Sequence, residues 1–312
     1  MRIVFMGTPD FSVGALEALI EAGHEIAAVV TQPDKPKGRS GQMQFPPVKE
    51  CALKHGLTIW QPQKIKTPEW VERLRELNAD VFIVAAFGQI LSKEILDMPK
   101  YGCVNIHASL LPKYRGAAPI NWAIINGEKE TGVTIMQMNE GIDTGDMLSH
   151  TVVPIAPKET AATLFDKLAK AGAELIVETL PRLEAGEITP VPQDESRATH
   201  VKMMGKSLGR IDWNKDAVTI ERLVRGLNSW PSAYTYFQEK SVKIWDCDVV
   251  ENDTTEVPGT IIAVAKDSFD VATGKGALRI RELQLEGKKR MDTRTFLLGN
   301  QWKAGMKFGQ AQ

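Results

Sequence analysis

Up to Gly186, short β-branched runs alternate with amphipathic helical patterns, and this alternation limits the possible folds more than any other feature of the chain. Strand-like runs at 2–7, 25–32, 80–88, 103–109 and 131–138 are separated by helix-like patterns at 11–23 and 67–78 and followed by a longer one at 160–180. Such alternation is typical of βαβ units, which build a mostly parallel sheet. The run 81–88 is apolar throughout, as expected of a central strand covered on both faces. The sequence therefore predicts an α/β domain at the start of the chain.

The pattern changes after Gly186. Residues 186–206 contain two prolines, mixed charges and no sustained period, which indicates a linker between domains. A helical pattern at 216–228 is followed by short runs punctuated by turns, as in a small β-barrel or sandwich. We therefore predict a first domain over 1–188, a linker over 189–206 and a second domain over 207–312.

Composition excludes several classes of protein. The chain has 38 Lys and Arg against 39 Asp and Glu, so its overall charge indicates no nucleic-acid or membrane partner. Any such partner would have to bind local patches of charge. Its three cysteines, Cys51, Cys103 and Cys247, show no ligand spacing, which argues for a reducing compartment and against disulfides or a zinc site. No stretch approaches the roughly 20 apolar residues of a membrane span. We expect a cytoplasmic protein without a metal.

The turn after the first strand resembles a dinucleotide-binding site in position only. The stretch Gly7–Phe11 reads GTPDF, and a proline, an acid and an aromatic replace residues that must let the backbone approach a pyrophosphate. The motif therefore argues against a nicotinamide or flavin enzyme. We expect Thr8 or Asp10 to cap the following helix.

Two polar side chains end the run 103–109. Asn105 and His107 lie on one face of an extended chain, because side-chain direction repeats every second residue. Asp143 follows the next strand-like run, and it can reach the imidazole if the two strands are neighbours. The residues alone allow two interpretations. These side chains either form a reaction site or only hold a loop in place through hydrogen bonds.

The segments NIHASLLPKYRGAAPINWAI (105–124) and ETGVTIMQMNEGIDTGDML (130–148) closely resemble the formyltransferase family that uses 10-formyltetrahydrofolate. The resemblance continues in FMGTPDFSV, TQPDKPKGRSGQ, IDW and NSWP, nearly from end to end. It implies a Rossmann-like first domain and an OB-type β-barrel as the second. It also implies 10-formyltetrahydrofolate as co-substrate, tetrahydrofolate as product and methionyl initiator tRNA as acceptor, with no metal, no membrane and no obligate protein partner.

The chemistry of formyl transfer agrees with the residues named. The reaction passes through a tetrahedral carbon that bears an oxyanion. Asn105 offers a neutral N–H donor, and His107 offers a charged one if it is protonated; such a donor contributes about 3 to 4 kcal/mol. Asp143 would hold the imidazole and help to move the proton from the attacking amine to the leaving nitrogen.

The resemblance also implies binding residues, each of which could instead be an ordinary turn or solvated loop residue. The expected folate contacts are Ser109, Leu110, Leu111, Pro112, Gln89, Ile90 and Leu91. The expected tRNA contacts are Arg39, Lys37, Lys206, Lys288, Lys289 and Arg290. Four tryptophans of the second domain are expected in the core of the barrel rather than as platforms on which bases stack: Trp213, Trp230, Trp245 and Trp302.

Three rivals remain at this stage. A sugar-nucleotide N-formyltransferase would share the Asn-His-Asp site but is expected to have a shorter basic loop around Arg39. A glycinamide ribonucleotide formyltransferase would end near the linker. A non-catalytic RNA-binding module would consume no folate.

Overall fold

The structure is a computed structural model that describes residues 1–37 and 41–309. The chain forms two compact units. One comprises Met1–Pro119, Glu130–Pro154 and Phe165–Val201, and the other comprises Ile120–Lys129, Ile155–Leu164 and Lys202–Gln312. The segment expected as a linker is therefore divided at Val201, and most of it clusters with the first unit.

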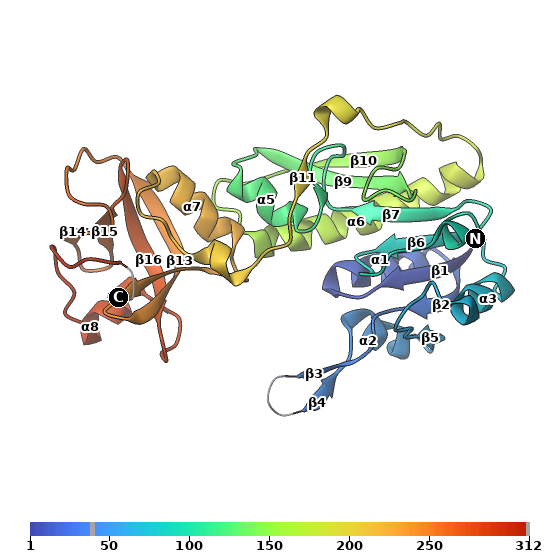
Figure 1. The fold of residues 1–312 in the computed structure, drawn as a ribbon, viewed down its shortest axis with the longest axis horizontal. Helices are drawn as coiled ribbons and strands as arrows, with labels where there is room; N and C mark the ends of the chain where they lie inside the picture. Colours follow the sequence, from blue (N-terminus) through green and yellow to red (C-terminus); the bar gives the residue numbers. More distant parts are fainter. Residues whose placement is uncertain (38–40, 310–312) are drawn as a thin grey trace. The chain divides into compact units, whose positions relative to one another are not determined.

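The first unit is built on a seven-stranded sheet with the order β10-β9-β7-β6-β1-β2-β5 (Figure 1). Its strands are β1 (Arg2–Gly7), β2 (Glu25–Val30), β5 (Ile59–Trp60), β6 (Val81–Ala85), β7 (Cys103–His107), β9 (Glu130–Gln137) and β10 (Met147–Pro154). The strands from β5 to β7 pair in parallel, whereas β9 and β10 add an antiparallel edge. The predicted mostly parallel sheet is confirmed.

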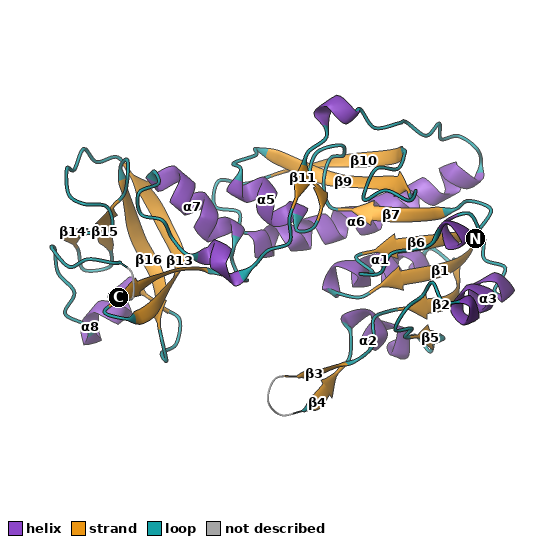
Figure 2. Ribbon diagram, in the orientation of Figure 1, coloured by secondary structure: helices purple, strands orange, loops and turns teal. Residues whose placement is uncertain are grey.

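Helices cover this sheet, as the secondary-structure colouring of Figure 2 shows. They are α1 (Asp10–Glu21), α2 (Pro47–Lys54), α3 (Pro68–Glu76), α4 (Lys93–Leu96) and α6 (Ala161–Glu184). Strand β6 is buried along its whole length, which explains its unbroken apolar sequence. Gly172 of α6 lets the helix approach the sheet closely, because a Cβ there would lie 2.9 Å from Cγ2 of Ile106.

The expected cap of α1 is wrong. Pro9 occupies the N-cap position, and no side chain of the described residues caps the helix. The hydroxyl of Thr8 instead donates to the carbonyl of Phe87, 3.0 Å away. It therefore joins the turn after β1 to the turn after β6.

Two short ribbons complete the first unit. Strand β3 (Lys35–Lys37) pairs with β4 (Gln42–Gln44), and β8 (Arg115–Gly116) pairs in parallel with β11 (His200–Val201). The second ribbon joins the turn after β7 to a segment more than 80 residues later in the chain. A 3-10 turn, η2 (Glu195–Arg197), lies just before this segment.

The second unit contains an antiparallel sheet with the order β12-β13-β16-β15-β14 and β17 paired to β16. Its elements are α5 (Pro119–Ile125, from Ile120 onward), η3 (Lys206–Gly209), α7 (Ala217–Gly226), β12 (Ala233–Phe237), β13 (Lys240–Val250), β14 (Ile261–Val264), β15 (Phe269–Ala272), β16 (Ala277–Leu285), β17 (Met291–Asp292) and α8 (Thr293–Gly299). Bridges from Gly309 to Tyr236 and from Lys307 to Thr260 join the two edges of the sheet. The predicted small β domain is confirmed.

The tryptophans of the second unit divide into two groups. Trp213 and Trp302 belong to or pack against its core, as expected. Trp230 is 58% exposed, so its expected core position is wrong. Trp245 lies outside the core cluster, with the cations of Lys243 and Arg290 against its ring. Within residues 1–37 and 41–309, no helix combines the length and apolar composition needed to cross a bilayer.

Candidate active site

The predicted pair of polar side chains lies on central strand β7. Strand β9 is its direct neighbour, with Asn105 opposite Met136 and His107 opposite Thr134. The prediction that these two strands are neighbours, which Asp143 needs in order to reach the imidazole, is therefore confirmed. Asn105 and His107 are 9% and 7% exposed, so each presents only a small part of its surface to solvent.

The three candidate catalytic residues differ in their hydrogen bonding. His107 Nε2 lies 2.9 Å from the carbonyl oxygen of Tyr114, which can only accept, so this nitrogen carries a proton. His107 Nδ1 lies 3.7 Å from Asp143 Oδ2, within ion-pair range but beyond a direct hydrogen bond. Among the described residues, the amide of Asn105 has no hydrogen-bond partner. It is therefore available as a donor.

Side-chain hydrogen bonds hold the turn after β7. The hydroxyl of Ser109 donates to the carbonyl of Lys113 at 2.7 Å. Thr134 Oγ1 accepts from the N–H of Leu111 at 3.1 Å and donates to the carbonyl of Ser109 at 2.7 Å. The residues expected to contact folate thus hold a fixed turn beside His107, and the hydroxyl of Ser109 is already engaged.

The second group of expected folate contacts, Gln89 to Leu91, occupies three different environments. Gln89 accepts from the N–H of Ile65 at 2.8 Å and donates to the carbonyl of Pro62 at 2.9 Å, so its side chain secures a neighbouring loop. Leu91 is buried in the core, whereas Ile90 is largely exposed. Ile90 is therefore the member of this group whose side chain is most accessible to a ligand.

The structure also adds a buried cation to the site. Arg115 is 1% exposed and forms a bidentate ion pair with Glu195, with N···O distances of 2.7 and 3.0 Å. Arg115 Nε donates to Gln193 Oε1 at 3.0 Å. The hydrogen bonds to Glu195 raise the pKa of Arg115, and the same bonds lower the pKa of Glu195. Sequence reasoning missed these partners, because Gln193 and Glu195 lie in a segment with no periodic pattern.

The expected tRNA contacts lie in both units. Lys206 begins η3, and Lys288 and Lys289 occupy the turn between β16 and β17; all three side chains are exposed. Arg290 is different, because it pairs with Glu282, one N···O distance being 2.7 Å, and lies over the ring of Trp245. Arg39 lies outside the described residues, and of Lys37 only the backbone, at the end of β3, is described.

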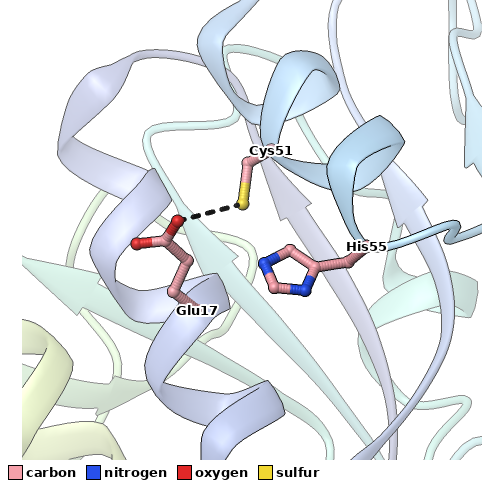
Figure 3. A group of neighbouring side chains, drawn as sticks. All are labelled: Glu17, Cys51 and His55. Atoms are coloured by element: carbon pink, nitrogen blue, oxygen red, sulfur yellow. Dashed lines mark hydrogen bonds between the residues drawn. The ribbon is translucent and has the colours of Figure 1, made fainter.

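A separate cluster joins α1 and α2 (Figure 3). The ligand-type atoms of Glu17, Cys51 and His55 all lie within 4.8 Å of one another. Thiol, imidazole and carboxylate are the donors that zinc prefers. However, the Cys51 thiol donates to Glu17, and burial raises the pKa of that thiol to about 11. This pKa opposes formation of the thiolate that a metal requires, and the cluster acts as a hydrogen-bonded contact between helices.

Known proteins resemble this chain over its whole length. Residues 1–180 match the family model described as Formyl transferase, and residues 203–301 match Formyl transferase, C-terminal domain. A methionyl-tRNA formyltransferase of Agathobacter rectalis is 60% identical over 299 residues, covering 96% of each chain. Another, of Lachnospira eligens, is 57% identical over 315 residues, covering 99% of this chain and 100% of that protein.

A solved structure shares the fold. It is an N-formyltransferase from Helicobacter canadensis in complex with folinic acid and dTDP-3-aminofucose. It has a TM-score of 0.68 at 18% identity, and the match covers 93% of this chain and 100% of that one. At this identity the likeness establishes the architecture and leaves the acceptor open.

Proposed function

The chain belongs to the formyl transferase family, and we infer that it transfers a formyl group to the amino group of methionyl-tRNA, giving N-formylmethionyl-tRNA for translation initiation. The observation that carries this conclusion is identity of 57 to 60% with methionyl-tRNA formyltransferases over nearly the full chain. We further propose that 10-formyltetrahydrofolate is the donor, that the acceptor is the initiator tRNA and that the reaction takes place in the cytoplasm.

We assign the chemistry to Asn105, His107 and Asp143. The amine attacks the formyl carbon, the new C–N bond forms, and the bond from that carbon to N10 of the folate breaks. The amide of Asn105, which has no partner among the described residues, donates to the developing oxyanion, and His107 adds positive charge beside it if the imidazole carries both protons. Asp143 takes the proton that the amine loses, directly or through water, and returns it to N10.

Binding roles follow the same proposal. The turn from Ser109 to Pro112 and the exposed Ile90 would line the folate site. Gln89 and Leu91 would stabilise the segment that carries Ile90. Arg39, Lys37, Lys206, Lys288 and Lys289 would contact tRNA. Arg290 is a weaker candidate, since Glu282 already neutralises its charge.

The test supplies the full-length protein with 10-formyltetrahydrofolate and charged initiator tRNA. We expect stoichiometric formation of N-formylmethionyl-tRNA and tetrahydrofolate, and no reaction with a dTDP-linked amino sugar. Formylation of the sugar but not of the tRNA would contradict the acceptor, and tRNA binding without folate consumption would contradict the enzyme assignment.

A further inference from the structure

We propose that residues 191–201, here called the strap, position Asp143 and His107 for formyl transfer. Gln193 and Thr199 are the positioning residues. The sequence predicted this segment as part of a linker, and no catalytic group lies in it. The proposal rests on the proposed function, because it concerns the same three catalytic residues.

The strap is attached by its backbone at both ends. Val191 exchanges two hydrogen bonds with Met147, which begins β10 directly after the Asp143 loop, at 2.8 and 2.9 Å. At the other end, the carbonyl of Thr199 accepts from the N–H of Arg115 at 2.8 Å, directly before β11 of the β8–β11 ribbon. The strap therefore connects the loop that carries Asp143 to the turn that follows His107.

Gln193 secures the Asp143 loop. Its Nε2 donates to the carbonyls of Asp143 and Gly145, each at 2.8 Å. Asp143 has a φ of 54°, in the left-handed region that few residues with a side chain adopt, although Asp does so more often than most. With its backbone held, the Asp143 carboxylate accepts from the N–H of Gly116 at 2.7 Å and faces the imidazole.

Thr199 secures the other side of the site. Its Oγ1 accepts from the N–H of Tyr114 at 2.8 Å. Tyr114 has a φ of 60°, which is unfavourable for a bulky residue, and its carbonyl accepts from His107 Nε2. The hydroxyl of Thr199 therefore stabilises the turn that orients the imidazole.

Arg115 determines which way the Gln193 amide points. A guanidinium can only donate, so the Gln193 oxygen must face Arg115 and its NH2 group must face the Asp143 loop. Glu195, which is 72% exposed, closes the network from the solvent side and leaves the buried cation paired. The NH2 group of Gln193 therefore faces the two carbonyl acceptors of the Asp143 loop.

The first experiment compares Gln193→Ala and Gln193→Glu with Gln137→Ala in the full-length protein. Gln137 is a matched control, because its Nε2 also lies near two backbone carbonyls, those of Tyr101 and Cys103, at 3.3 and 3.4 Å. We expect kcat to fall between about ten- and a hundredfold in both Gln193 variants, since misplaced groups lose transition-state contacts. KM for 10-formyltetrahydrofolate should stay within about twofold. Gln193→Glu keeps the shape but loses the donor, so it should be no better than alanine.

The second experiment compares Thr199→Val with Thr199→Ser. Valine removes the acceptor for Tyr114 and should lower kcat at least about fivefold, whereas serine restores the hydroxyl and should keep kcat near that of the wild type. This pair decides the proposal if the Gln193 variants fail to fold.

Two kinds of failure are distinguishable. If the wild-type protein formylates no tRNA, the proposed function is wrong. If the wild-type protein is active and Gln193→Ala keeps its kcat, or loses it only as much as Gln137→Ala does, the strap has no positioning role. Equal kcat values for the valine and serine variants of Thr199 would likewise overturn the proposal.

Discussion

At the scale of single residues, the three candidate catalytic side chains differ in whether they already form a hydrogen bond within the protein. The amide of Asn105 has no partner within residues 1–37 and 41–309, whereas His107 donates to Tyr114 and Asp143 accepts from Gly116. A group without protein partners can change its contacts during the reaction at little structural cost. Asn105 is therefore the residue whose removal should separate turnover from stability.

We predict that Asn105→Ala, His107→Ala and Asp143→Ala each lower turnover at least about a hundredfold, since each removes a transition-state contact. A double variant should be close to the worse single variant, because the groups act as a unit. Asn105→Ala should keep the wild-type free energy of unfolding, whereas Asp143→Ala should lose about 1 kcal/mol with the bond to Gly116. Single-turnover kinetics and urea unfolding check both parts. Normal turnover in Asp143→Ala would rule out its proton-transfer role.

The ion pair between Arg115 and Glu195 should make folding stability depend on pH. Hydrogen bonds from Arg115 lower the pKa of Glu195 in the folded state below its ordinary value of about 4.3. A lowered folded pKa stabilises the protein above the unfolded value, and the gain is lost as pH falls through the folded pKa. Wild-type protein should therefore be more stable than Glu195→Gln at pH 7, and the difference should shrink below about pH 4. A gap that does not change with pH would contradict this.

At the scale of elements, the close approach of α6 to the sheet supports the strand that carries the site. Gly172 is buried against Ile106, the residue between Asn105 and His107. The β-branched side chain of Ile106 is fixed at χ1 and cannot easily move aside. The distance between helix and sheet is therefore set by the lack of a side chain at one position.

We predict opposite effects for two glycine substitutions in helices. Gly14→Ala in α1 should stabilise the protein by up to about 1 kcal/mol, because a Cβ there meets only ordinary contacts at 3.9 Å and alanine favours helix. Gly172→Ala should destabilise it by about 1 kcal/mol, since overpacking outweighs the same helix preference. Denaturant unfolding of the two variants measures the difference. A stabilised Gly172→Ala would show that the sheet can yield at Ile106.

The turn between β16 and β17 should contribute to tRNA binding through Lys288 and Lys289, which form no ion pair with another described residue. Replacing Lys288 and Lys289 with alanine should reduce the slope of log K against log salt by about 1 to 2, at about 0.9 for each phosphate contact with a duplex. Arg290→Ala should change the slope less, because Glu282 compensates its charge. Affinity measured across a salt series tests this. An unchanged slope in the double variant would remove the turn from the tRNA site.

At the scale of the whole molecule, the second unit includes two segments that come early in the chain. Asn121 donates to the carbonyl of Gly226 at 2.8 Å, and Ala162 donates to the carbonyl of Asn228 at 3.0 Å. Gly226 also lies against Ile125, where a Cβ would come within 2.5 Å of that side chain. Residues 120–129 and 155–164 thus depend on partners beyond residue 202.

We therefore predict that a chain ending at Val201 loses more than a tRNA-binding module. Its segment 120–129 should become sensitive to proteolysis, since Ile120 and Ile124 are buried in the full chain and this segment clusters with residues beyond 202. Its thermal unfolding midpoint should fall below that of the full-length protein. Limited proteolysis and calorimetry measure both effects. A fragment as stable and as protected as the full chain would show that the first unit folds independently of these segments.

The sequence alone determined the features that depend on local geometry. Alternating strand and helix patterns predicted the mostly parallel sheet, the turn-rich second half predicted the small β domain, and the period of two placed Asn105 and His107 on one face. Tertiary structure alone decided which distant groups meet. Arg115 pairs with Glu195, Thr8 bonds to Phe87 instead of capping α1, and Trp230 is exposed. The physical reason is that the spacing of apolar residues shows only which side of one segment faces a core. Which distant residue a polar group contacts depends on how the whole chain folds back on itself.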